Sequence, residues 1–83
     1  MKAGRLSAWD KACLRVLILK HLTQKRDYLE SVMIRCRYLT KRYTASGVKE
    51  ACKEICESRP KSDRGERILF FVEMLSEESH LML

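Results

Sequence analysis

Residues 29–43 read LESVMIRCRYLTKRY, and the apolar side chains of this stretch recur at steps of three and four residues. That spacing places them on one face of an α-helix. The face consists of Leu29, Val32, Met33, Cys36, Leu39 or Thr40, and Tyr43. The opposite side carries the cations Arg35, Arg37, Lys41 and Arg42. This stretch therefore predicts an amphipathic helix that buries one side against the rest of the chain.

An earlier helix is predicted from the stretch between Gly4 and Gly47, where the chain has no other glycine and no proline. Ser7, with Asp10 three residues later, resembles a capping box, so this helix is expected to begin near Ala8. The polar residues 23–27 are the expected break before the next helix. One continuous helix is the alternative, because the apolar residues between 18 and 43 also fit a heptad repeat.

The first helix is apolar over much of its circumference. One stripe consists of Trp9, Ala12, Cys13, Val16, Leu17 and the stem of Lys20, and a second consists of Leu14, Ile18 and Leu22. A helix with two apolar stripes is expected at the centre of a bundle or beneath another chain.

Two further helices follow the turn residues 44–47. Ser46 is the expected N-cap of the third helix, whose core positions are Val48, Ala51, Cys52, Ile55 and Cys56. This helix is expected to be short, because Pro60 ends it before a loop over residues 58–62. Asp63 and Glu66 form a capping box for the fourth helix. A buried strand over residues 68–72 is rejected, because no second strand exists to pair with it.

These elements predict an all-α fold, a small bundle of about four helices whose first two are long. The 83 residues allow a single domain spanning 1–83, and the apolar end at 80–83 indicates either docking of the last residues or a chain cut from a longer protein. The expected core consists of Ile18, Leu29, Val32, Cys36, Val48, Cys52, Ile55, Ile68, Phe71 and Leu75.

The charge is unevenly distributed along the chain. The net charge is +6, but residues 1–43 carry +8, and residues 44–83 carry −2. Such a field steers encounters with an anionic surface or with the acidic face of another copy. The sequence shows no secretory signal and no apolar run long enough to span a membrane, so an intracellular protein, cytoplasmic or nuclear, with four reduced cysteines is expected.

Neither a metal site nor a catalytic site is predicted. Cys52 and Cys56 lie one helical turn apart and could bind zinc with Cys36 or His21, but they occupy positions where the periodicity demands apolar residues. His21 is expected on the surface, and His80 lies near the chain end, so neither accompanies a nucleophile. The adjacent acids at 77 and 78 point about 100° apart on a helix and do not share a proton. The chain is expected to be neither an enzyme nor the holder of a cofactor.

The sites expected to bind a partner lie on two kinds of surface. Arg35, Arg37, Lys41 and Arg42 are expected to meet an acidic protein or another copy of this chain, and Leu14, Phe70 and Met74 are candidates for apolar contact outside the core. Nucleic acid is the alternative partner of the basic face, because Tyr38 and Tyr43 are interleaved with the cations and could stack on bases. A membrane is not expected, because this helix buries its apolar side.

The order of segments also carries a resemblance to a known family. Four features follow one another along the chain: Tyr28-Leu29-Glu30-Ser31-Val32-Met33, then Tyr38-Leu39-Thr40, then a short third helix, and then Pro60, Asp63 and Arg67 before the run at 68–75. This order is similar to that of the caspase recruitment domain of the death-fold superfamily. The resemblance covers residues 28–75. It implies a non-enzymatic adaptor that associates with a like domain through charged patches of opposite sign. The residues alone lead to a similar hypothesis, a helical protein-interaction or assembly module.

Overall fold

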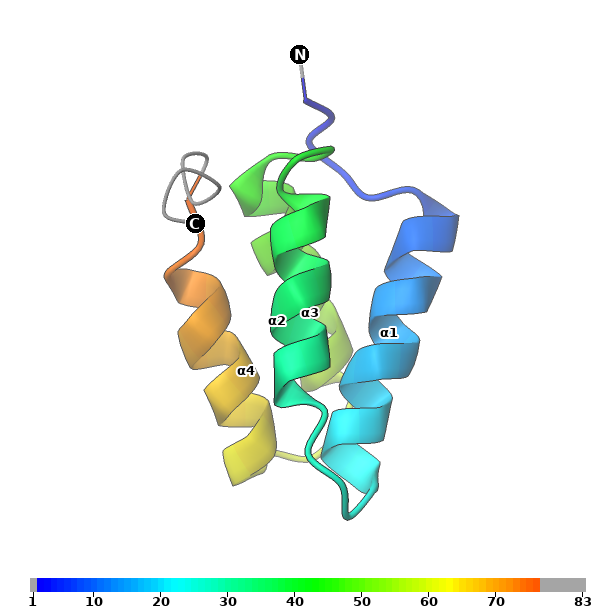
Figure 1. The fold of residues 1–83 in the computed structure, drawn as a ribbon, viewed down its shortest axis with the longest axis vertical. Coiled ribbons are helices and arrows are strands. Elements are labelled where there is room, and N and C mark those ends of the chain that lie inside the picture. The colour runs from blue at the N-terminus through cyan, green and yellow to red at the C-terminus, as the bar shows by residue number, and fades with distance from the viewer. Residues whose placement is uncertain (1, 77–83) are drawn as a thin grey trace.

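The computed structural model of this protein describes residues 2–76, which form four helices. They are α1 (Ala8–Thr23), α2 (Leu29–Leu39), α3 (Ala45–Glu57) and α4 (Asp63–Glu73). Consecutive helices run in opposite directions, and α2 lies in front of α3 with α1 and α4 on either side (Figure 1). The predicted all-α bundle of four helices is therefore confirmed. Within residues 2–76 the backbone forms no strand, only an isolated bridge between Ala3 and Tyr43.

The first two helices are separate, and the break lies where the polar cluster predicts it. α1 ends at Thr23, and Gln24 adopts an extended conformation that ends the helical hydrogen-bond pattern. From α4, the Arg64 guanidinium donates to the carbonyl oxygens of Gln24 and Lys25 in the connection that follows. These contacts hold a sharp reversal between the helices, so the continuous-helix alternative does not form.

Two of the three predicted N-caps are shifted along the chain. Ser7 caps α1 as predicted, accepting from the amide of Asp10. For α3 the cap is Thr44 instead of Ser46, and for α4 it is Ser62 instead of Asp63. In both, the hydroxyl of an extended residue accepts from an amide three positions later, and Ser46 and Asp63 lie inside the first helical turn. α3 consequently has 13 residues and is longer than α2, which has 11.

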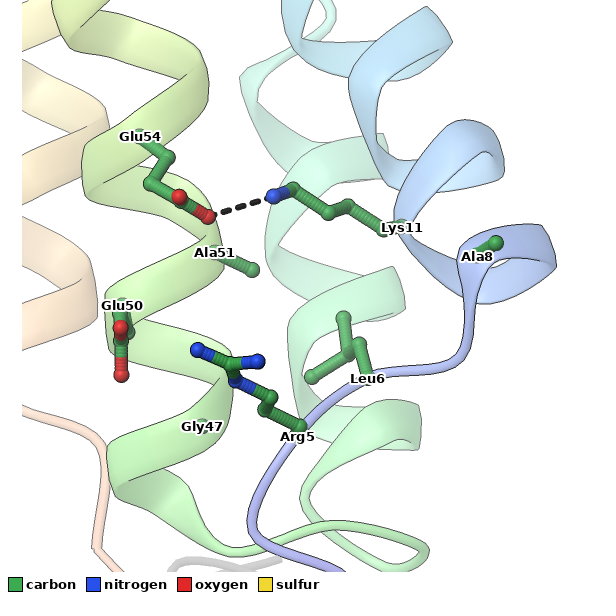
Figure 2. A pocket seen from close by; sticks show the side chains of 8 residues that line it. All are labelled: Arg5, Leu6, Ala8, Lys11, Gly47, Glu50, Ala51 and Glu54. Carbon is green, nitrogen blue, oxygen red and sulfur yellow. Dashed lines mark hydrogen bonds and ion pairs between the residues drawn. The ribbon is translucent and has the colours of Figure 1, made fainter.

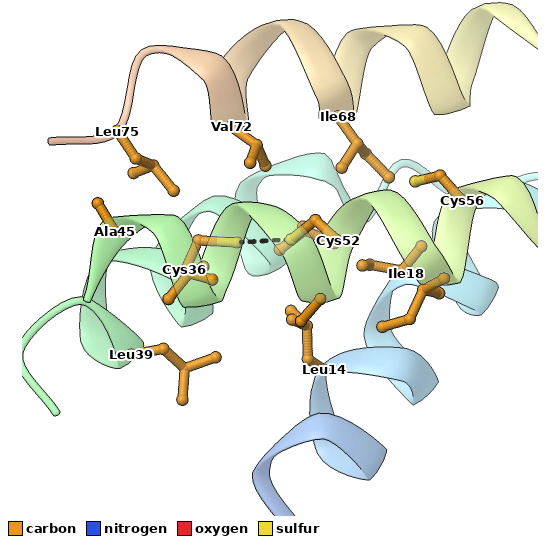
Figure 3. Packing of buried hydrophobic residues seen from close by; sticks show 14 of the residues in the cluster. Leu14, Ile18, Cys36, Leu39, Ala45, Cys52, Cys56, Ile68, Val72 and Leu75 are labelled. Carbon is orange, nitrogen blue, oxygen red and sulfur yellow. Dashed lines mark hydrogen bonds between the residues drawn. The ribbon is translucent and has the colours of Figure 1, made fainter. Parts of the chain in front are cut away.

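The core lies where the four helices meet (Figure 3). Eight of the ten expected core residues are buried, and Leu29 and Phe71 are partly buried against them. The buried eight are Ile18, Val32, Cys36, Val48, Cys52, Ile55, Ile68 and Leu75. α3 contributes most to this core, because seven of its residues are buried. The third helix, and not the first, therefore occupies the most enclosed position in the bundle.

α1 turns only one of its two apolar stripes to the core. Leu14 and Ile18 are fully buried. The expectation that Leu14 makes contacts outside the core is therefore wrong, because no part of its side chain is exposed. On the other stripe, Trp9 is 76% exposed and Val16 is 53% exposed. α1 thus lies at the side of the bundle and leaves apolar surface facing solvent.

The segment before α1 crosses the turn between α2 and α3. The Ala3 carbonyl accepts from the Thr44 amide at 2.9 Å, and the Lys2 ammonium donates to the Thr40 carbonyl at 2.6 Å. Gly47 allows this close approach: a Cβ added there would lie only 2.4 Å from the Gly4 carbonyl oxygen. Residues 2–7 therefore belong to the folded unit, and we call them the N-terminal strap.

Candidate interaction surface

A groove of about 510 Å³ runs between α1 and α2 on the outer side of the bundle. Its lining consists of Leu17, Ser31, Ile34, Arg35 and Tyr38. We call it the α1–α2 groove. Helical periodicity places Ile34 and Tyr38 on the side of α2 opposite Cys36, so they cannot reach the core. Ile34 is 56% exposed, which makes it an apolar side chain with no cover in the bundle.

Cations surround the α1–α2 groove. The Arg35 guanidinium lies over the Tyr38 ring, 5.4 Å from its centroid, and Arg42 donates to the Tyr38 hydroxyl at 3.4 Å. At the other end, the Lys20 ammonium lies 5.8 Å from the centroid of the Tyr28 ring. These contacts hold the positive groups beside the aromatic rings. No acidic residue lines the groove.

Asp10 lies close to Arg42, and its carboxylate already has hydrogen-bond partners of its own. Asp10 is buried and accepts hydrogen bonds from the hydroxyls of Tyr43 and Ser7, and Arg42 lies 3.5 Å from it. The hydrogen bond from Tyr43 and the charge of Arg42 lower the pKa of Asp10. This carboxylate therefore stays ionised and pairs with Arg42, whereas Arg35 is the cation that lines the groove itself.

The four predicted cations do not form one face. Arg37 lies on the other side of α2, where its guanidinium is 5.6 Å from the centroid of the Phe71 ring of α4. The reason is geometric, because Arg35 and Arg37 are two positions apart and point about 200° from each other on a helix. Lys41 and Arg42 follow the last residue of α2, and both are exposed in the turn there. The cations that the contacts place on the α1 side are thus Arg35 and Arg42.

A second groove, of about 640 Å³, lies between α2 and α4. Phe70 and Met74 line it and are 73% and 70% exposed, so they lie outside the core as predicted. The charges of its lining are mixed: Asp63 and Glu66 are acidic, and Arg67 is basic. We call it the α2–α4 groove, and its charges favour no single sign in a partner.

A third pocket, of about 320 Å³, lies between the N-terminal strap, α1 and α3 (Figure 2). Its charged lining residues are Arg5, Lys11, Glu50 and Glu54. Lys11 reaches across to Glu54 and forms an ion pair with it. The lining charges therefore balance one another, and the ion pair joins α1 to α3.

Cys36, Cys52 and Cys56 are core residues, Cys13 is half-buried, and all four are free thiols. Cys36 and Cys52 meet between α2 and α3, with their sulfur atoms 3.7 Å apart (Figure 3). The hydrogen bond between them and burial raise the pKa of Cys52, and burial raises the pKa of Cys56. These thiols are therefore poor nucleophiles. In the part of the chain from 2 to 76, no three His, Cys, Asp or Glu side chains are grouped so that they could hold a metal ion.

His21 is not on the surface, contrary to the expectation. It is 2% exposed, its Nδ1 accepts from the Tyr28 amide at 3.2 Å, and its Nε2 has no hydrogen-bond partner. Burial lowers the pKa of His21, as do Arg64 and Arg67, and Asp27 opposes them. The step from Leu14 and Ile18 to residue 21 is a helical one, so the periodicity contained a signal for its burial. His80 and the acids at 77 and 78 lie outside the described residues.

None of the helices formed by residues 2–76 is both long enough and apolar enough to cross a membrane. Among known proteins, no family model, no curated sequence and no solved structure matches this chain. The roles assigned to the residues around the α1–α2 groove therefore rest on their geometry and chemistry alone.

Proposed function

We propose that this protein is a non-enzymatic interaction module that binds the acidic surface of another protein through its α1–α2 face. The observation that carries the proposal is the α1–α2 groove, in which exposed Ile34 and half-exposed Tyr38 lie beside Arg35 and Arg42 with no acid in the lining. Apolar and aromatic side chains together with arginine are the residues that contribute most to protein–protein binding.

Nucleic acid is the second candidate partner, because Arg35 and Arg42 contact Tyr38 and Lys41 is exposed in the turn that follows α2. Two features favour a protein instead. Interfaces with nucleic acid are more polar and more strongly basic than protein–protein interfaces, whereas this groove exposes Ile34 beside Arg35. Tyr38 is also engaged by Arg35 and Arg42, which occupy the ring and the hydroxyl that a base would need.

The adaptor role agrees with what the resemblance to the caspase recruitment domain implies for residues 28–75. Those residues make up α2, α3 and α4 with their connections. Membership of that family is part of the proposal. An intracellular setting belongs to it too, because four free thiols suit a reducing compartment.

The test compares two charge reversals on the same helix. Arg35→Glu changes the α1–α2 groove, and Arg37→Glu makes the same change on the α4 side of α2. Binding of poly-L-glutamate is followed by fluorescence anisotropy at near-physiological salt, with circular dichroism as the check of folding. We expect Arg35→Glu to weaken binding about tenfold or more, and Arg37→Glu to change it by less than about threefold.

Absence of binding to the acidic polypeptide would overturn the proposal, as would equal losses in the two variants. Saturable binding of a DNA duplex that weakens steeply as salt increases would instead favour the nucleic-acid candidate.

A further inference from the structure

We infer that the α1–α2 groove takes one amphipathic α-helix of a different protein, with its apolar side in the groove and carboxylates along its edges. This inference rests on the proposed function and specifies the partner. It starts from the arrangement of α1 and α2, which lie side by side and run in opposite directions (Figure 1). Two neighbouring helices leave a furrow into which the side chains of a third helix fit.

Both walls of the furrow offer apolar side chains. α1 contributes half-buried Leu17, and α2 contributes exposed Ile34. α1 also exposes Val16 and Trp9, the two exposed members of its outer stripe, which do not line the groove. An occupant needs apolar residues at i, i+3, i+4 and i+7 to follow these walls, the spacing typical of helices that bind in grooves.

The length of the groove matches a short helix. The part of α2 that lines the groove runs from Ser31 to Tyr38, and a rise of about 1.5 Å per residue gives this wall a length of about 12 Å. An occupant of about three helical turns would cover that wall. An extended segment would instead have to satisfy its own backbone groups, because the groove is lined by helix side chains and offers no strand edge.

The charges select an acidic helix. Lys20 lies near one end of the groove, with Arg35 and Arg42 toward the other, so cations are found along its whole length. Carboxylates on the flanks of the occupant would face these cations, and no acid is part of the groove lining. A basic or neutral helix of the same shape would lack these contacts.

The same charges disfavour a second copy of this chain. Its net charge of +6 repels another copy. The exposed apolar residues of its α4, Phe70 and Met74, share their groove with Arg67, and Arg37 lies nearby over Phe71. Docking α4 of one copy into the α1–α2 groove of another would bring these cations toward Arg35.

The experiment uses the full chain and three synthetic peptides of about three helical turns. The first carries leucines at i, i+3, i+4 and i+7 and glutamates on the flanks. The second has the same composition with the leucines spread around the helix, and the third has lysine in place of glutamate. Fluorescence anisotropy measures the binding of each peptide.

We expect saturable binding of the first peptide, and binding about tenfold weaker or more for the other two. Ile34→Glu should weaken binding of the first peptide by about tenfold or more. Phe70→Glu is the matched control, because it introduces the same acid at an exposed apolar position in the α2–α4 groove, and we expect it to bind as the unmodified chain does.

Each other outcome overturns the inference in an identifiable way. Equal binding of the first two peptides means that charge alone is recognised, and the proposed function stands without a helix. If no peptide binds but poly-L-glutamate still does, charge alone is again recognised, and only the helix inference is overturned. If neither the peptides nor poly-L-glutamate bind, the proposed function is overturned as well. If the unmodified chain self-associates, if Ile34→Glu and Phe70→Glu each abolish this association, and if a mixture of the two variants associates again, the occupant is a second copy of this chain. Loss of binding to phosphatidylserine vesicles in Ile34→Glu alone identifies lipid as the occupant.

Discussion

The guanidinium of Arg64, near the start of α4, donates to the carbonyl oxygen of His21 in the last turn of α1 at a distance of 2.7 Å. It also donates to the carbonyl oxygens of Gln24, Lys25 and Arg26. One cation thus satisfies acceptors that the end of a helix leaves without partners, and it lies at the negative end of the α1 dipole.

Replacing Arg64 tests this contact. We expect Arg64→Ala to lower the free energy of unfolding by about 2 kcal/mol, the magnitude of hydrogen bonds to charged groups. Arg64→Lys should retain part of the stability that Arg64→Ala loses, because an ammonium cannot reproduce the forked hydrogen bonds of the guanidinium. Urea denaturation measures both variants, with Arg59→Ala in the exposed loop before α4 as the control. Equal stabilities of the alanine variants at 64 and 59 would contradict the contact.

His21 predicts a dependence of stability on pH. Its pKa is lowered in the folded protein from the ordinary value of 6.5. The unfolded chain therefore binds a proton more readily than the folded one, and stability falls as the pH falls from about 6.5 through the folded-state pKa. Above 6.5 this contribution is complete. Protonation of Nδ1 would also remove the acceptor of the Tyr28 amide.

Urea denaturation between pH 7.5 and 5 follows this loss, and His21→Asn is the comparison. Asparagine offers an acceptor near the position of Nδ1 but does not titrate. We expect the variant to be less stable at pH 7.5, because its side chain is smaller, and to lose less stability toward pH 5. The assignment to His21 is wrong if both proteins show the same slope.

Substitution by alanine is expected to have opposite effects on stability at Gly47 and at Gly65. A Cβ at Gly47 would collide with the Gly4 carbonyl, whereas one at Gly65 would meet only ordinary contacts at 3.4 Å and 3.6 Å. We expect Gly47→Ala to destabilise by about 1 to 3 kcal/mol through the strap. Gly65→Ala should gain up to about 1 kcal/mol, because alanine is the better helix former. Thermal unfolding ranks the two variants.

Hydrogen exchange at the Thr44 amide locates the effect. This amide donates to the Ala3 carbonyl, so Gly47→Ala should accelerate its exchange and Gly65→Ala should not. A Gly47 variant that is as stable as the unmodified chain, with a protected Thr44 amide, would show that the strap does not depend on this glycine.

Leu14 and Val16 test which stripe of α1 faces the core. Leu14 is fully buried, so Leu14→Ala should destabilise by about 3 kcal/mol, the loss typical of a cavity left by a leucine. Val16 is half-exposed, so Val16→Ala should change stability by about 0.5 kcal/mol or less. Denaturant unfolding measures the stability of both variants. A larger loss of stability in Val16→Ala than in Leu14→Ala would show that the Val16 stripe faces the core.

Much of the fold follows from spacing along the chain. The positions of Val32, Cys36, Ile55 and Ile68 in the core could be predicted because each lies on a single apolar face of its helix. α1 has two such faces, and periodicity cannot choose between them. The choice depends on Asp10, which is buried because the Tyr43 hydroxyl, 33 positions later, satisfies its carboxylate.

The candidate site could be predicted only in part. From the sequence, Arg35 and Arg42 are predicted on a basic face and Phe70 outside the core. The sequence does not show that Arg37 lies on the opposite side of α2, over the Phe71 ring. The α1–α2 groove arises from the packing of two helices, so no local pattern contains it. The burial of His21 likewise depends on the Tyr28 amide and on Arg64, which packing brings to it.

The strap has a consequence for the order in which the chain acquires its shape. The Thr40 carbonyl and the Thr44 amide form hydrogen bonds with Lys2 and Ala3, about forty positions earlier in the chain. During synthesis Lys2 and Ala3 leave the ribosome before Thr40 and Thr44 and cannot form these hydrogen bonds until that turn has emerged. Because contacts between such distant positions close late, we expect this turn to be among the last parts to become rigid.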